Sequence, residues 1–244
     1  MEFFKNIFAR IWALWALITF IITFIIFLIP SLFAYAFKDF KKGQAFFLKI
    51  AKIWMDIWLF LIACPVKIYG RENYSRNENY IVVFNHNAFL DVPLSAPYVG
   101  GPNKTIAKDS FAKIPLFGLY YKRGSVLINR KDERSRQKSF EQMKKVLAMG
   151  INMCIYPEGT RNRSSQPLKP FYDGAFKLAE ATNKKILPCI ITGTKKAMPI
   201  NKTFYLLPTK LEMHFMKPVP PVGSVKDLKD KVYRIMAEKY ISEA

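Results

Sequence analysis

Two long apolar segments dominate the first part of the chain. Residues 11–37 contain no charged side chain, and one helix of that length would be about 40 Å long, against a hydrocarbon core of about 30 Å. Trp12 and Trp15 lie near one end and Tyr35 near the other, as aromatic side chains do at membrane interfaces. The stretch is much longer than the apolar region of a signal peptide, about 7–15 residues, so we expect an uncleaved anchor.

The second apolar segment, residues 46–66, is interrupted by Lys49, Lys52 and Asp56. Such charges are costly in a spanning helix, so this segment is expected to lie in the interface or to form the return arm of a re-entrant hairpin. We therefore expect residues 1–66 to form a membrane-embedded two-helix segment and residues 67–244 to form a separate domain.

Strand and helix patterns alternate through the rest of the chain. Short β-branched or apolar runs predict strands, and longer amphipathic runs predict helices. The expected strands are residues 80–84, 104–107, 125–128, 152–156, 186–192, 203–207 and 210–216, and the expected helices are residues 134–149, 176–181 and the segment after Ser224. This alternation predicts an α/β fold with a mixed, largely parallel sheet flanked by helices.

The net charge of +20 implies an anionic partner, such as lipid headgroups, a phosphorylated substrate or nucleic acid. The basic residues are spread along the chain, without zinc-finger spacing or a basic region joined to heptads, so nucleic acid is not expected. Cys64, Cys154 and Cys189 lie in apolar runs without ligand spacing. They are expected to be buried thiols in a reduced compartment, and we expect no metal and no cofactor.

One of the two histidines, His86, lies at a position typical of active-site residues in α/β proteins. His86 follows the expected strand 80–84, and ligands of open α/β sheets bind outside the carboxyl ends of strands. Asp91 comes five residues later, about 140° away on a single helix, so the two side chains meet only if the chain bends between them. The carboxylate would then hold one imidazole nitrogen and leave the other as a general base. The alternative is that Asp91 only caps a helix and that His86 is an unrelated polar residue at a strand end. The other histidine, His214, lies in a late strand and is expected to be structural.

Two further strand ends carry unusual polar residues. Arg130 follows the expected strand 125–128, and Glu158, Gly159 and Arg161 follow the strand 152–156. Parallel strands would bring these ends to one edge of the sheet. The planar fork of arginine matches phosphate oxygens, so the arrangement suits a phosphorylated lipid at a membrane surface.

At four places the sequence resembles the glycerolipid acyltransferase family, whose best-known members are the lysophosphatidic acid acyltransferases. The matching blocks are NHNAFLD at residues 85–91, GSVLINR at 124–130, YPEGTR at 156–161 and ILPCII at 186–191. They occur in the family's order. Departures from the family pattern are Ala88 for serine, Leu127 and Asn129 for phenylalanine and aspartate, Tyr156 for phenylalanine, and Asn162 for a frequent serine.

The resemblance implies a mechanism and a set of site residues. His86, held by Asp91, would take the proton from the acceptor hydroxyl, and the alkoxide would attack an acyl thioester directly. Arg130 and Arg161 would place the acceptor phosphate, while Glu158 would orient an arginine or a backbone turn. The other positions to which the resemblance assigns substrate binding are Lys108, Gly124, Gly159, Thr160 and Pro188, the last as an acyl-chain or donor contact.

The function implied is transfer of an acyl group from acyl-CoA or acyl carrier protein to lysophosphatidic acid, giving phosphatidic acid at the cytoplasmic face of the inner membrane. The expected partners are therefore membrane lipids, lysophosphatidic acid and the acyl donor. Two alternatives stay open: an acyltransferase for another lysophospholipid or a lyso-aminolipid, and a non-enzymatic basic protein of membrane surfaces or nucleic acid. Nonspecific electrostatic binding, however, does not require polar residues at strand ends.

Overall fold

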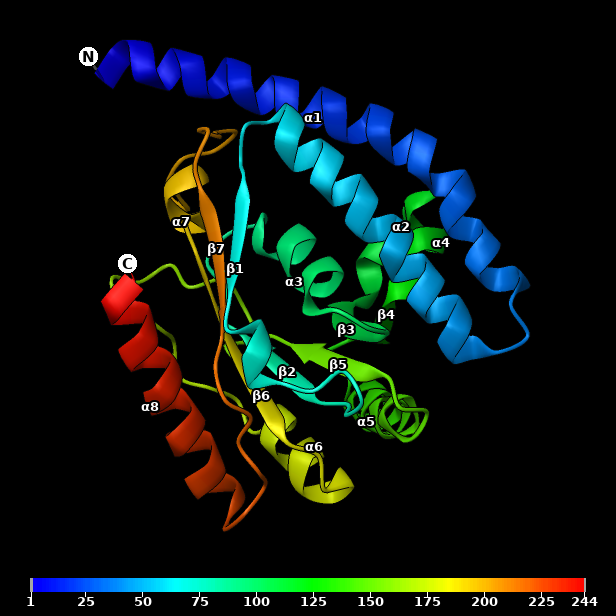
Figure 1. Ribbon diagram of the computed structural model, residues 1–244. Coiled ribbons are helices and arrows are strands. Elements are labelled where there is room, and N and C mark those ends of the chain that lie inside the picture. Colours follow the sequence, from blue (N-terminus) through cyan, green and yellow to red (C-terminus); the bar gives the residue numbers. More distant parts are fainter. Residues whose placement is uncertain (1, 244) are drawn as a thin grey trace.

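The structure, a computed structural model, describes residues 2–243 and contains a seven-stranded sheet covered by helices on both faces (Figure 1). The strands are β1 (Val66–Tyr69), β2 (Ile81–Phe84), β3 (Asn103–Lys108), β4 (Ser125–Ile128), β5 (Asn152–Ile155), β6 (Ile186–Thr192) and β7 (Leu211–Phe215). The helices are α1 (Glu2–Leu32), α2 (Phe40–Leu61), α3 (Asp91–Val99), α4 (Phe117–Gly124), α5 (Glu133–Ala148), α6 (Gly174–Thr182), α7 (Thr194–Ala197) and α8 (Val225–Glu243). Three short 3₁₀ turns, η1 (Phe33–Ala36), η2 (Arg71–Asn73) and η3 (Asp109–Lys113), complete the elements.

The sheet is mixed and largely parallel, which confirms the expected fold class. Its strand order is β1-β7-β6-β2-β5-β3-β4. The strands from β6 to β4 in that order are parallel, whereas β7 runs antiparallel to β6 and carries β1 parallel to itself. The carboxyl ends of β2, β3, β4, β5 and β6 therefore meet at one edge of the sheet.

Alternation along the central strand β2 divides the core into two layers. Val82 and Phe84 pack in a cluster with Trp54 of α2 and with Leu94 of α3. On the opposite face, Ile81 and Val83 pack in a second cluster with side chains of α5, α6 and α8, including Met143, Phe176 and Leu228. A strand buried on both faces has no polar side, and this is why residues 80–84 form a continuous apolar run.

Helices α1 and α2 form an antiparallel hairpin across one side of the sheet (Figure 1). The inward face of α1 includes the small residues Ala9, Ala13, Ala16 and Thr19, which let the two helices approach closely. Phe20 and Phe24 pack between them against tryptophans of α2. The boundary expected after residue 66 stays a prediction, although Trp54 and Trp58 of α2 belong to the same core cluster as Phe84 of the sheet.

The tryptophans of this hairpin tie the two helices together. The indole nitrogens of Trp12 and Trp15 donate hydrogen bonds to the carbonyls of Ile62 and Leu61, at 3.0 and 2.9 Å. The last carbonyls of a helix lack partners within it, and the indoles supply them for α2. Trp12 and Trp15 therefore fix the return arm of the hairpin, while their expected position at a membrane interface stays a prediction.

A row of large apolar side chains on the opposite face of α1 points outward. Ile11, Ile22, Ile25 and Ile29 are between 52% and 67% exposed. By length and composition, the segment Glu2–Ala36 is long and apolar enough to cross a membrane. An exposed apolar surface of this extent is typical of a membrane contact, because soluble proteins rarely expose contiguous apolar patches.

One expected strand is absent from the structure, and one strand of the structure was not expected. Residues 203–207 form an irregular segment, because Phe204 has a φ of +48° and the N–H groups of Leu206 and Leu207 donate to Ala9 and Ala197 rather than to a neighbouring strand. The edge strand β1 had not been expected. It has only four residues and pairs with β7 alone, so its pattern is short and only partly apolar.

Candidate active site

His86 and Asp91 lie in contact at the carboxyl end of β2. Residues 85–90 form a loop between β2 and α3, and Asp91 is the first residue of that helix. His86 Nδ1 lies 2.8 Å from Asp91 Oδ2. The bend that the spacing required is therefore present, and the aspartate is not merely a helix-capping residue.

The carboxylate of Asp91 also organises the loop that carries the histidine. Its Oδ2 accepts hydrogen bonds from the backbone N–H groups of Asn87 and Ala88, at 2.6 and 2.8 Å. Asp91 is fully buried, so these donors replace the water that an ionised carboxylate needs. The same carboxylate thus fixes both the imidazole and its backbone.

The second ring nitrogen of His86 stays accessible. Within residues 2–243 no protein group lies within hydrogen-bonding distance of Nε2, and 16% of the side chain is exposed. With Asp91 as acceptor, the neutral ring carries its proton on Nδ1 and offers the lone pair of Nε2. The ring of Tyr156 packs against the imidazole with a centroid distance of 4.5 Å, while its hydroxyl lies 2.8 Å from Ser95 Oγ.

Glu158 joins the loop after β5 to the loop after β2. It is fully buried, and its two oxygens accept from the backbone N–H groups of His86 (2.7 Å) and Lys169 (2.9 Å). The carbonyl of His86 in turn accepts from the backbone N–H of Asn162 at 2.7 Å. Burial raises the pKa of Glu158 to about 7, against the lowering effect of these N–H donors. Of the two orienting roles expected for Glu158, these contacts favour holding a backbone turn.

Each arginine lies against one of these two loops. A methyl group added at Gly159, whose φ is +71°, would lie 3.6 Å from Arg130 Nη1, so the guanidinium of Arg130 is close to the Gly159 backbone. Arg161 places its Cζ 3.8 Å from the centroid of the Phe89 ring. Neither guanidinium has a carboxylate partner among the described residues, and burial lowers the pKa of both. Positive charge without an ion-pair partner therefore lies at the loops after β2 and β5.

Arg130 lies at the same edge of the sheet as His86 but farther from it than Arg161 does in strand order. Of the two strands that precede the arginines, β5, before Arg161, flanks β2 in the sheet, whereas β4, before Arg130, is the edge strand beyond β3. At a strand spacing of about 4.8 Å, the end of β4 is about 14 Å from the end of β2. The long arginine side chain covers part of this gap.

Of the other candidate residues, some lie at the carboxyl edge of the sheet, near His86, and two lie elsewhere. Lys108 ends β3, and Thr160 accepts a hydrogen bond from Lys169 Nζ at 2.7 Å. Gly124 precedes β4 and so lies at the opposite, amino edge of the sheet, where it faces Phe47. Pro188 is buried within β6, paired with Val83.

Sequence reasoning missed a contact from the end of the chain. The hydroxyl of Tyr240 in α8 accepts a hydrogen bond of 3.3 Å from the side-chain amide of Asn87, the residue that follows His86 in the sequence. Asn87 is buried, so its side chain depends on this contact. No local pattern marks such a pair, because 153 residues separate its members.

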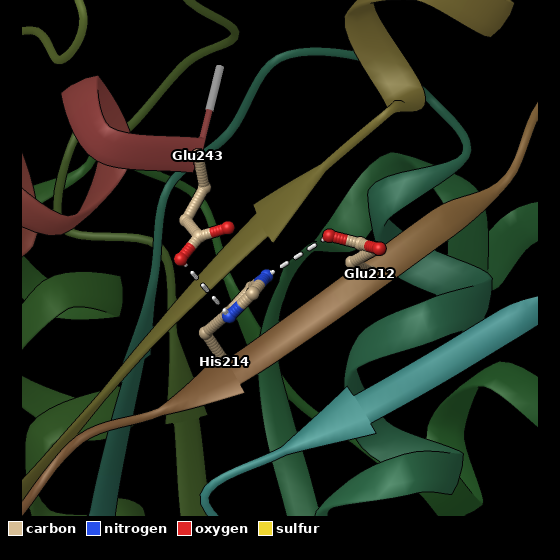
Figure 2. A group of neighbouring side chains, drawn as sticks. All are labelled: Glu212, His214 and Glu243. Atoms are coloured by element: carbon tan, nitrogen blue, oxygen red, sulfur yellow. Dashed lines mark hydrogen bonds and ion pairs between the residues drawn. The ribbon is translucent and has the colours of Figure 1, made fainter.

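The other histidine lies in a cluster on the β7 side of the sheet. His214 has Glu212 Oε2 3.3 Å from one ring nitrogen and Glu243 Oε1 4.0 Å from the other (Figure 2). Among the described residues, this is the group whose ligand atoms lie close enough together to suggest a metal ion. The two carboxylates, however, already pair with Lys210 and Lys239, and they face opposite sides of the ring. The cluster is an ion-pair network that fastens the last turn of α8 to β7.

Comparison with known proteins gives consistent matches. Residues 65–192 match the family model described as Acyltransferase. A 1-acyl-sn-glycerol-3-phosphate acyltransferase of Chlamydomonas reinhardtii is 33% identical over 187 residues, which are 75% of this chain and 56% of the relative. A probable 1-acyl-sn-glycerol-3-phosphate acyltransferase of Mycoplasma pneumoniae is 27% identical over 235 residues, which are 89% of this chain and 88% of the relative. The chain spans about half the length of several plant and algal relatives that it matches.

The fold has a solved counterpart. The crystal structure of the 1-acyl-sn-glycerophosphate acyltransferase from Thermotoga maritima superimposes with a TM-score of 0.80 over 99% of this chain and 97% of that one. The sequence identity is 23%, so this similarity concerns the fold, including the arrangement of the N-terminal helices with the sheet.

Proposed function

This chain belongs to the acyltransferase family, and from that premise we propose that it transfers a fatty acyl group from an acyl thioester to the sn-2 hydroxyl of 1-acylglycerol-3-phosphate, giving phosphatidic acid. The observation that carries the proposal is the pair of His86 and Asp91, with one imidazole nitrogen accessible. Two arginines without carboxylate partners lie near it, Arg161 against Phe89 and Arg130 at Gly159. The relatives' names support the same acceptor.

In the proposed reaction, His86 Nε2 accepts the proton of the acceptor hydroxyl as the oxygen attacks the thioester carbonyl. The new bond joins this oxygen to the acyl carbon, and the carbon–sulfur bond breaks. The departing thiolate, whose conjugate thiol has a pKa of about 8.5, takes the proton back from the imidazolium. Asp91 stabilises the positive charge on the ring during the step. Because the hydroxyl attacks the donor directly, no acyl-enzyme is required.

Arg130 and Arg161 are proposed to bind the acceptor phosphate. A phosphate monoester carries close to two negative charges at neutral pH, and a guanidinium edge can bind two of its oxygens at once. Fixing the phosphate at these side chains would hold the sn-2 hydroxyl near His86. Orientation of this kind contributes to the rate as well as to affinity.

The proposed location is the inner membrane, with the site at its cytoplasmic surface. The apolar outer face of α1 supports membrane association, and bacterial relatives support a bacterial-type enzyme. Acyl-CoA and acyl carrier protein are both anionic and cytoplasmic, so either suits a basic site that faces the cytoplasm. Neither the catalytic residues nor these donors require a metal or another cofactor in the proposed chemistry.

The test is an acylation assay with the purified full-length protein in detergent or vesicles. Labelled acyl-CoA and acyl carrier protein thioesters would each be offered with a panel of lysolipids that differ in headgroup. We expect product with 1-acylglycerol-3-phosphate and little with the choline and ethanolamine lysolipids. A preference for another lysolipid, absent in His86→Ala, would replace the acceptor while keeping the chemistry.

A further inference from the structure

Phe89 is an exposed aromatic residue whose contact is unusual for a surface position. The side chain lies in the turn between His86 and Asp91 and is 59% exposed, whereas its neighbour Leu90 is buried. Its ring faces the guanidinium of Arg161, with Cζ 3.8 Å from the ring centroid. Cations attracted to aromatic rings lie within about 6 Å of the centroid, so this is a close example.

The two side chains come from loops that are firmly joined. Glu158 accepts from the N–H of His86, and Asn162, the residue after Arg161, donates its N–H to the carbonyl of His86. These bonds hold the backbone on both sides of Arg161 to His86, three residues before Phe89. The stack therefore has a defined position relative to the imidazole.

Stacking leaves the edge of the guanidinium for a ligand. A Cζ only 3.8 Å from the ring centroid leaves no room for an N–H pointing into the ring, so the face of the planar group must lie on it and the N–H donors along the edge. No acceptor for these donors occurs among the described residues. Burial is the largest cause that lowers the pKa of Arg161, and the positive charge of the nearby Arg163 lowers it further. A phosphate that approaches the edge would meet donors already held in one plane.

We propose that Phe89 is a positioning residue for the acceptor phosphate: its ring holds the guanidinium of Arg161 so that the donor edge faces the site beside His86. This inference rests on the proposed function, and it assigns a role in acceptor binding to Phe89, the fifth residue of the block NHNAFLD. Without the ring, the long arginine side chain would sample other rotamers, and ordering it would cost part of the binding free energy.

A competing explanation is that Phe89 only contacts lipid, as the exposed side chains of α1 and α2 would. Substitutions that separate ring from apolarity distinguish the two. Phe89→Leu keeps an apolar side chain and removes the aromatic face, whereas Phe89→Tyr keeps the face. Phe60→Leu is the matched control, because Phe60 of α2 is 82% exposed and contacts no guanidinium.

The experiment measures KM for 1-acylglycerol-3-phosphate and for the acyl thioester in the full-length variants, together with vesicle sedimentation. Phe89→Leu should raise the acceptor KM about three- to tenfold and leave the donor KM within about twofold, while Phe89→Tyr and Phe60→Leu stay near wild type. Equal changes in Phe89→Leu and Phe60→Leu, or weaker sedimentation that accounts for the loss, would overturn the proposal in favour of lipid contact.

A double-mutant cycle with Arg161→Ala completes the test. If the ring acts through the arginine, Phe89→Leu should have little further effect once Arg161 is alanine. An undiminished effect of Phe89→Leu in the Arg161→Ala background would overturn the positioning role while the phosphate assignment stands. An unchanged acceptor KM in Arg161→Ala itself would instead remove the phosphate assignment, and the role of Phe89 with it.

Discussion

The two histidines of this chain each lie beside a carboxylate, yet their surroundings differ in the feature that matters for catalysis. His86 has Asp91 on one ring nitrogen at 2.8 Å and an accessible second nitrogen. His214 has Glu212 on one side at 3.3 Å and Glu243 on the other at 4.0 Å, and its ring is stacked on Tyr69 (Figure 2). A carboxylate partner is therefore common to both.

The difference lies in what remains available after pairing. Asp91 is buried with backbone donors and without a lysine, so its charge acts on the imidazole. Glu212 lies 2.6 Å from Lys210 and is only partly buried, so much of its charge is already compensated. A histidine becomes a candidate base when its partner is dedicated to it and one nitrogen remains free for substrate. His214 meets neither condition.

The largest expected effect comes from removing the base. His86→Ala should lower kcat about 10²–10⁴-fold, because general-base catalysis contributes about that much. The melting temperature should change little, since the side chain is partly exposed and Asp91 keeps its two backbone donors. Steady-state kinetics and thermal unfolding of the purified variant check both points. Wild-type turnover in His86→Ala would disprove the assignment of the base.

A smaller but still clear effect is expected from Glu158→Gln. Glutamine has one oxygen where glutamate has two, so either the N–H of His86 or that of Lys169 would face an amide nitrogen in a buried site. A buried donor without an acceptor costs about 1–3 kcal/mol, and in a chain of this size each kcal/mol lowers the melting temperature by about 2–4 °C.

Glu158→Gln should also reduce kcat about tenfold through displacement of the His86 backbone. Glu212→Gln is the control, because Glu212 is a partly buried glutamate outside the site and should leave kcat unchanged. Full activity and stability in Glu158→Gln would mean that these two hydrogen bonds do not position the base.

The smallest effect is expected from His214→Gln. We expect kcat within about twofold of wild type and a loss of about 1 kcal/mol of stability, because a buried stacked ring is replaced by a less suited side chain. Kinetics and thermal unfolding at pH 7.5 would measure both. A loss of activity approaching that of His86→Ala would overturn the distinction between the two histidines.

The pH dependence of the His214 network follows from its carboxylates. Lys210, the largest cause, lowers the pKa of Glu212 below its ordinary value of 4.5. A lowered folded-state pKa means that the pairing stabilises the fold above the ordinary value and is lost as the pH falls through the lowered one. The network should therefore weaken on acidification below about pH 4.5.

Much of the fold and the site could be predicted from the sequence because the signals were local. The continuous apolar run of 80–84, rich in β-branched and aromatic residues, predicted a buried strand, and it ends two residues before His86. The interval of five residues between His86 and Asp91 required a bend, and the start of α3 at Asp91 supplies it. The long uncharged run of α1 likewise predicted a helix with an apolar outer surface.

Other features depend on contacts between distant segments, which no local pattern records. The backbone N–H groups that Glu158 binds belong to His86 and Lys169, and only the packing of two loops decides that both its oxygens are used. The reach of Arg130 from an edge strand to Gly159 and the contact of Tyr240 with Asn87 arise in the same way. Periodicity and residue type thus determined which elements form and where polar residues end them. Tertiary packing decided which of those residues meet, because buried polar groups must find partners wherever the folded chain places them.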